Sequence, residues 1–149
     1  MSFRTDMTDQ KITDLKAVEQ AVLGLNQDGI PCKLIHNAKP RMHNTEREST
    51  MCEYVIQLKN GKYDLGLKGQ KDDKGRITHY IPVFDYYGNH VGNQIGYPED
   101  ARSVGNIAHI GKFMRQYSEF ATKRRVVQDG HEYNRRKDKQ GNLHYQLNY

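Results

Sequence analysis

The sequence of 149 residues contains no tryptophan, two cysteines and four prolines. Cys32 and Cys52 are too few for the disulfide scaffold of a small secreted domain, and their separation matches no zinc-binding motif. No stretch comes near the ~18 consecutive apolar residues that cross a membrane, and the N-terminus has no apolar signal segment. We therefore expect a protein of the reducing cytoplasm that makes no membrane contact, with both thiols buried in strands.

Hydrophobic residues are also scarce, at 36% of the chain against the ~45–50% that is typical of globular proteins. The mean hydropathy of −0.93 agrees with this. Ten tyrosines and four phenylalanines nevertheless exceed what a disordered tail carries. The length suits one ordinary domain, so we expect residues 1–149 to form a single folded unit.

Two stretches have the apolar spacing of helices. Thr13 and Asp14 are both suitable N-caps for a first helix, which should end before Gly29. A second helix is expected from residue 100 or 106 to residue 128, with Asp129-Gly130 as its end. The apolar face of the first helix, with spacings of three and four residues, is formed by Leu15, Val18, Val22 and Leu25.

Runs of alternating apolar residues predict strands between the helices and after the second helix. Asn60-Gly61 separates two of them and is a strong hairpin signal. Pro82 cannot donate to a sheet ladder, so its strand is expected at an edge or to end there. The glycine-rich residues 85–98 are expected to form turns or a loose hairpin. The expected strands are residues 3–9, 32–36, 52–58, 63–68 and 77–83, followed by a C-terminal pair at 131–136 and 142–148.

These elements predict an α+β fold, a single two-layer domain in which an antiparallel sheet of about five strands carries two helices on one face. The order of the elements resembles a ferredoxin-like layout. The core is expected to come from apolar positions of both helices and of the strands. The expected core residues are Leu15, Val18, Val22, Leu25, Val55, Leu65, Ile81, Ile107, Met114, Tyr117 and Phe120.

The net charge of +5 comes from the end of the sequence. Residues 1–108 hold 14 basic and 14 acidic side chains, whereas residues 109–149 hold nine basic and four acidic ones. A charge excess in one segment favours an anionic partner. A solvated helix face followed by an exposed hairpin remains the alternative interpretation.

The basic segment is interleaved with tyrosines, a mixture that suits the phosphates and bases of a nucleic acid, while its cations also suit an acidic protein surface. It carries no RNP1, KH or helix-turn-helix signature. We expect a small non-enzymatic binding or regulatory protein, with an acidic protein surface ranked slightly above nucleic acid as its partner. The expected partner-binding residues are Lys112, Arg115, Lys123, Arg124, Arg125, Tyr133, Arg135, Arg136, Lys137, Lys139 and Tyr145.

No catalytic, metal-binding or cofactor-binding motif is present, so we expect no cofactor. The carboxylate pair Asp72-Asp73 lies in a lysine-flanked turn and not in a desolvated pocket. The alternative is an enzyme that acts on nucleotides or nucleic acids, with histidines that meet across the sheet near the loop Gly88–Gly96. The histidines available are His36, His43, His79, His90, His109, His131 and His144.

Three stretches resemble one known family. They are residues 11–21 (KITDLKAVEQA), residues 60–65 (NGKYDL) and the C-terminal block from Phe113 to Tyr149, which ends in an aromatic-rich segment. In these stretches the chain resembles the hypothetical chloroplast frame 35 family, small proteins of plastid, cyanobacterial and cyanophage genomes. The resemblance implies a small cytosolic α+β protein in a photosynthetic or phage setting. It implies no known activity, so no functional residue is carried over. Family members have a tryptophan after the central hairpin, which this chain lacks.

Overall fold

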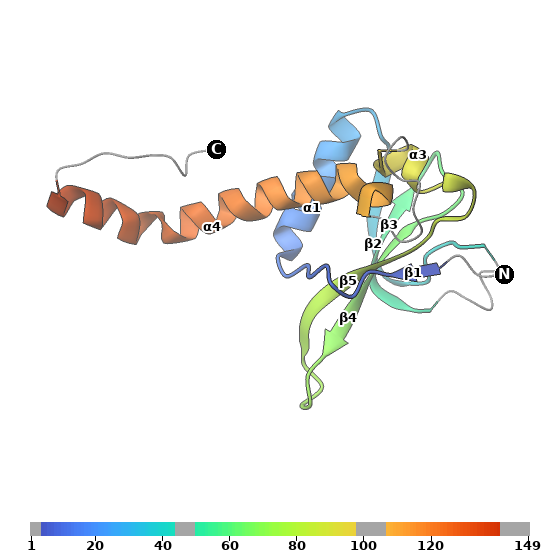
Figure 1. Cartoon of the computed structure of the whole chain (residues 1–149), viewed down its shortest axis with the longest axis horizontal. Coiled ribbons are helices and arrows are strands. Elements are labelled where there is room, and N and C mark those ends of the chain that lie inside the picture. The colour runs from blue at the N-terminus through green and yellow to red at the C-terminus, as the bar shows by residue number, and fades with distance from the viewer. Residues whose placement is uncertain (1–3, 44–49, 98–106, 141–149) are drawn as a thin grey trace.

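A five-stranded antiparallel sheet with helices on one face forms the body of the protein (Figure 1). The computed structural model describes residues 4–43, 50–97 and 107–140, with side chains up to residue 128. The two long helices pack on the same face of the sheet, so the expected α+β fold is confirmed. The elements are β1 (Arg4–Asp6), α1 (Leu15–Gln27), β2 (Cys32–Ala38), β3 (Cys52–Leu58), β4 (Leu65–Lys71), β5 (Ile77–Asp85) and α4 (Gly111–Gln140).

The strands follow the order β1-β5-β4-β3-β2, and each neighbouring pair is antiparallel. Strands β2 to β5 are consecutive neighbours, and β1 pairs with the outer side of β5. Helix α1 therefore carries the chain from one edge of the sheet to the other. The ferredoxin-like layout is not confirmed, because four consecutive strands form a meander and α4 follows the last of them.

The strand that contains Pro82 is an inner strand and continues to Asp85, so both the expected edge position and the expected end at Pro82 are wrong. β5 lies between β4 and β1, and the ladder with β1 runs only from Arg4↔Asp85 to Asp6↔Val83. The Pro82 carbonyl accepts a hydrogen bond from the Met7 N–H at 2.9 Å. Pro82 has no N–H that could donate a hydrogen bond back to Met7, and this missing hydrogen bond ends the ladder between β1 and β5 at Asp6.

The hairpin expected around Asn60-Gly61 is confirmed as the β3–β4 pair. Its last paired residues are Ile56 and Leu65, so the turn is wider than two residues. Asp64, which is buried, closes this turn by accepting a hydrogen bond from the Leu58 N–H at 3.2 Å. A salt bridge from Arg41 to the same carboxylate, at 2.8 Å, fixes the segment after β2 against the turn.

Helix α1 begins and ends where its sequence predicts. The Asp14 side chain accepts a hydrogen bond from the Ala17 N–H at 3.1 Å and is the N-cap. Gly29 follows the helix with a φ of 84°, a left-handed conformation that favours glycine. Within the helix, a β-carbon at Gly24 would lie 2.5 Å from the Gln116 side chain of α4, so glycine permits the close approach of the two helices.

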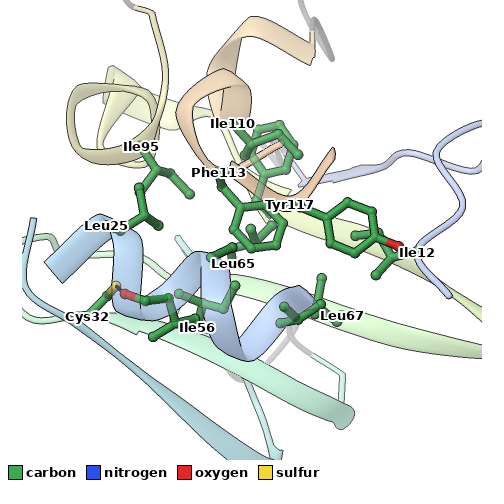
Figure 2. Close-up of a cluster of buried hydrophobic side chains, with 14 of the residues drawn as sticks. Ile12, Leu25, Cys32, Ile56, Leu65, Leu67, Ile95, Ile110, Phe113 and Tyr117 are labelled. Carbon is green, nitrogen blue, oxygen red and sulfur yellow. Dashed lines mark hydrogen bonds between the residues drawn. The ribbon is translucent and has the colours of Figure 1, made fainter. Parts of the chain in front are cut away.

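The main core lies between the sheet and the helices, and Figure 2 shows Phe113 and Tyr117 of α4 inserted into it. Of the expected core residues, seven are buried, and these are Val18, Val22, Leu25, Val55, Leu65, Ile81 and Tyr117. The remaining four are only partly buried, and these are Leu15, Ile107, Met114 and Phe120. Fully buried residues outside the expected set include Ile12, Phe84, Ile95, Ile110 and Phe113.

Helix α4 continues to Gln140, so the strand expected at residues 131–136 is wrong. Gly130 does not end the helix, because an interior glycine costs only ~1 kcal/mol relative to alanine, and the Glu, Arg, Lys and Gln residues that follow favour helix. The strand expected at residues 142–148 lies outside the described residues. At 1.5 Å per residue α4 spans ~45 Å, and Figure 1 shows its C-terminal half projecting away from the sheet.

In the described part of the chain, no helix combines the length and the apolar content needed to cross a membrane.

Of the turns or loose hairpin expected at residues 85–98, a turn is present and the hairpin is wrong for residues 85–97. This stretch contains a 3₁₀ turn, Tyr87–Asn89, and the short helix α3, Gly92–Ile95. Val91 and Ile95 are both fully buried and four residues apart, which is a helical spacing. The main chain thus turns to bury two apolar side chains that a hairpin would place on opposite faces.

Both cysteines are buried and free, as expected. Cys32 belongs to the core beneath α1, whereas Cys52 lies on the other face of the sheet beside Gly66 and Pro40. Burial raises the pKa of both thiols, that of Cys52 to about 11. Both therefore stay protonated at neutral pH.

The Tyr117 hydroxyl accepts hydrogen bonds from the Thr13 and Asp14 N–H groups at 3.0 and 3.2 Å. We predict that Tyr117→Phe lowers the free energy of unfolding by ~1–3 kcal/mol, because two partly buried donors lose their acceptor. Urea denaturation followed by circular dichroism measures the change. Tyr97→Phe is the control. It removes a hydroxyl that is bonded to the exposed Arg115, so a change within ~0.5 kcal/mol is expected. Equal losses for the two variants would contradict the prediction.

Candidate functional site

A groove of about 590 Å³ lies between the N-terminus of α1 and the middle of α4. Lys11 and Lys16 contribute positive charge from the α1 side, and Arg124 and Arg125 contribute it from α4. We call this the basic groove. Hydroxyl groups add hydrogen-bonding capacity to its lining, from Thr13, Tyr117, Ser118 and Thr122.

Tyr117 joins the two walls of the basic groove. Its ring is buried in the core, and Figure 2 shows its hydroxyl directed toward the segment of Ile12. There the hydroxyl accepts from the Thr13 and Asp14 N–H groups, which precede the first turn of α1. The segment before α1 is held from its other side by Ile12, which pairs with Tyr80 of β5. The main chain before α1, which lines the groove, is therefore held from both sides.

Asp14 connects the helix cap to the charge of the groove. Its carboxylate accepts from the Arg124 guanidinium at 2.7 Å and from the Ala17 N–H at 3.1 Å. Partial burial raises the pKa of Asp14, but these two hydrogen bonds and the nearby positive charge lower it by more. The pKa of Asp14 is therefore below its ordinary value of 3.8, and the carboxylate is charged at neutral pH. The positive charge of Arg124 is balanced by the Asp14 carboxylate in this contact.

The other three cations keep their charge available. Lys11, Lys16 and Arg125 are exposed, and they form no ion pair with the side chains that the structure describes, which end at residue 128. An anion in the groove would therefore meet three positive charges that no described carboxylate balances.

Two further hollows border α4. One, of about 420 Å³, is lined by Phe120, Lys123 and Val127 of α4, by Gln20 of α1, and by Arg124 and Gln128, which it shares with the basic groove. We call this the apolar groove, because apolar atoms make up most of the surface area that lines it. The other lies near the start of α4, where Lys112 and Arg115 face Tyr97 and Asp28.

The structure places ten of the eleven expected partner-binding residues on one helix and not on a helix and a hairpin. All nine basic residues of the C-terminal segment fall within Gly111–Gln140, together with its four acidic residues, so α4 alone accounts for the net charge of +5. Lys112, Arg115, Lys123, Arg124 and Arg125 border the three hollows. The side chains of Tyr133, Arg135, Arg136, Lys137 and Lys139 are beyond the described ones, and Tyr145 lies outside the described residues.

The sequence analysis did not select Lys11, Lys16 or Asp14 for the site. Lys11 and Lys16 flank the predicted N-cap, and their charges are balanced by acidic residues elsewhere in residues 1–108. Counting charge along the chain could not show that this cap lies beside Arg124, 110 residues away. The one local signal in the sequence was the presence of a lysine on each side of the predicted start of the helix.

Two of the histidines, His43 and His90, contact the same tyrosine near Gly88–Gly96, and no contact between their own rings is seen among the described residues. The rings of His43 and Tyr87 are stacked at 4.5 Å, and His90 packs edge-on against Tyr63 at 4.9 Å. The Tyr63 hydroxyl lies 3.4 Å from Nδ1 of His43, so one tyrosine connects the two histidines.

The carboxylates near these histidines have structural partners. Asp85 is buried and accepts from the His43 and Tyr87 N–H groups at 2.9 and 2.8 Å. Asp64 is bound by Arg41, as described above. Within residues 4–43, 50–97 and 107–128, no group of three or more histidine, cysteine or acidic side chains is arranged to hold a metal ion. The arrangement gives no specific support to an enzymatic site there, and the enzyme alternative stays a prediction.

Comparisons of the chain with models of protein families, with curated proteins and with solved structures found no match.

The Asp14–Arg124 contact gives a pH-dependent contribution to stability. Because the folded-state pKa of Asp14 is lowered, this contribution is present above the unfolded pKa of ~3.9 and is lost as the pH falls through the lower folded value. Asp14→Asn keeps a capping side chain but removes the charge, so we expect a loss of ~0.5–1 kcal/mol at pH 6. This difference from wild type should shrink as the pH falls below ~3.9 and should vanish below the lowered folded-state pKa of Asp14. Chemical denaturation at several pH values measures it, and a difference that does not change with pH would contradict the prediction.

Proposed function

We propose that this protein is a non-enzymatic binding protein that engages an anionic macromolecule through the basic groove and α4. The observation that carries the proposal is the convergence of Lys11 and Lys16 with Arg124 and Arg125 in one groove of about 590 Å³. Three of these cations have no ion-pair partner among the side chains described up to residue 128. The groove therefore gathers positive charge that no described carboxylate balances.

The shape of α4 supports the same function. Its first half packs on α1 and the sheet, while its second half projects from the body (Figure 1). A helix rich in charged residues that leaves the core gains little from its own apolar contacts. Its sequence, with Arg135, Arg136, Lys137 and Lys139 close together, suits an acidic surface or a phosphate backbone.

The resemblance to the hypothetical chloroplast frame 35 family stays a prediction. If the chain is a member, the setting is cyanobacterial or cyanophage, and the protein acts in the cytoplasm as a regulator directed at a host protein. The proposal of an anionic partner does not depend on that membership, since it rests on the groove and on the charge of α4.

The triple variant Lys11→Gln, Lys16→Gln and Arg125→Gln removes three charges from the basic groove without touching Asp14, Arg124 or Tyr117. We predict that its affinity for anionic probes falls at least ~tenfold, since each lost contact is worth ~0.5 kcal/mol. The probes are polyglutamate and a 20-nucleotide oligothymidylate, both carrying a fluorophore, and the readout is fluorescence anisotropy at several NaCl concentrations.

The control is Lys33→Gln, Lys62→Gln and Lys74→Gln, which makes the same change of net charge at exposed positions away from α4. It should weaken binding less than ~twofold, because charges beyond a Debye length of ~10 Å are screened. The proposal fails if the groove variant binds both probes as tightly as wild type, or if the two triple variants lose affinity equally.

A further inference from the structure

Beside the basic groove, on the side of α4 that carries Phe120, lies the apolar groove. Val127 on its wall is 78% exposed, and Leu23, three residues after Gln20 on α1, is 63% exposed. Large apolar side chains with this exposure are rare in the rest of the described chain. Lys123 lies between Phe120 and Val127 in sequence, with its ammonium group 5.7 Å from the Phe120 ring centre. The surface is thus apolar and basic at once.

The two grooves form one continuous surface, because Arg124 and Gln128 line both of them. A partner that fills the apolar groove therefore reaches the cations of the basic groove. Phe120 and Val127 are seven residues apart, two helical turns or ~10 Å along α4. This is also the distance between residues i and i+7 on a partner helix, so apolar side chains with helical spacing fit between them.

The exposed chemistry distinguishes a protein partner from a nucleic acid. Single-stranded nucleic acids bind through bases stacked on exposed aromatic rings. Among the α4 side chains that the structure describes, which end at residue 128, the aromatic rings are those of Phe113 and Tyr117, which are buried, and of Phe120, which is partly buried beneath Lys123. Val127 has no ring on which a base could stack.

We infer that the partner of this surface is an acidic amphipathic protein segment, which packs apolar side chains against Phe120 and Val127 and directs carboxylates to Lys123 and the basic groove. This inference rests on the proposed function and specifies its partner. Charge complementarity with α4 selects the acidic residues, and the apolar groove selects a segment with one apolar face.

The test starts from a displayed library of random 16-residue peptides, selected on the intact wild-type protein. We expect the enriched peptides to be acidic and to carry apolar residues at helical spacings of three, four and seven. Enriched peptides are then synthesised with a fluorophore, and their dissociation constants are measured by anisotropy. Val127→Ser should weaken binding about five- to tenfold, because it removes an apolar contact that the partner buries.

Met51→Ser is the matched control, because Met51 is also exposed (56%) but precedes β3, away from α4. It should bind the peptides as wild type does. The inference is overturned if no acidic amphipathic pattern is enriched, if Val127→Ser leaves the affinity unchanged, or if oligothymidylate binds more tightly than the enriched peptides and displaces them. In each of these cases the triple variant of the basic groove tests the proposed function separately. If that variant loses affinity for polyglutamate and oligothymidylate, the proposed function is retained. If its affinity for both probes is unchanged, the proposed function fails as well.

Discussion

The contact between Tyr117 and the segment before α1 determines where α4 lies. The ring fills the core next to Phe113, and the hydroxyl accepts two main-chain N–H groups at the start of α1. Gly24 lets the helices approach closely enough for this contact. Without it, only apolar burial and the side-chain contacts of Arg124 with Asp14 and of Gln116 with Asp28 would hold α4 against α1.

The segment before α1 has two roles, which both depend on Asp14. Asp14 caps α1 and neutralises Arg124, so a charge that would otherwise repel the neighbouring cations is balanced inside the protein. Lys11, Lys16 and Arg125 have no ion-pair partner among the side chains that the structure describes, and they are the cations that we propose for the ligand. Stability and binding thus depend on different charges of the same groove, and substitutions can separate them.

The sequence predicted the parts of the structure that depend on local interactions. It did not predict the parts that depend on contacts between distant segments. Helix α1, with its Asp14 cap and its end before Gly29, was found because both signals are local, and so was the β3–β4 hairpin. The strand order was not found, because the pairing of β1 with β5 depends on contacts between distant segments. The end of α4 was misplaced at Gly130 because one glycine was given more weight than the helix formers after it. Half of the site was found from the charge of α4, and Lys11 and Lys16 were missed because only folding brings them to Arg124.

The position of β1 and of the segment up to Asp14 also constrains the order in which the chain can fold. β1 pairs with β5, and the residues before α1 bond to Tyr117, 104 positions later in the sequence. During synthesis this N-terminal segment has no native partner until the meander is complete and α4 has begun to emerge. Contacts of such long range form slowly and raise the contact order of the fold. The two walls of the groove therefore come together only through contacts between residues more than 100 positions apart, after α4 has been synthesised.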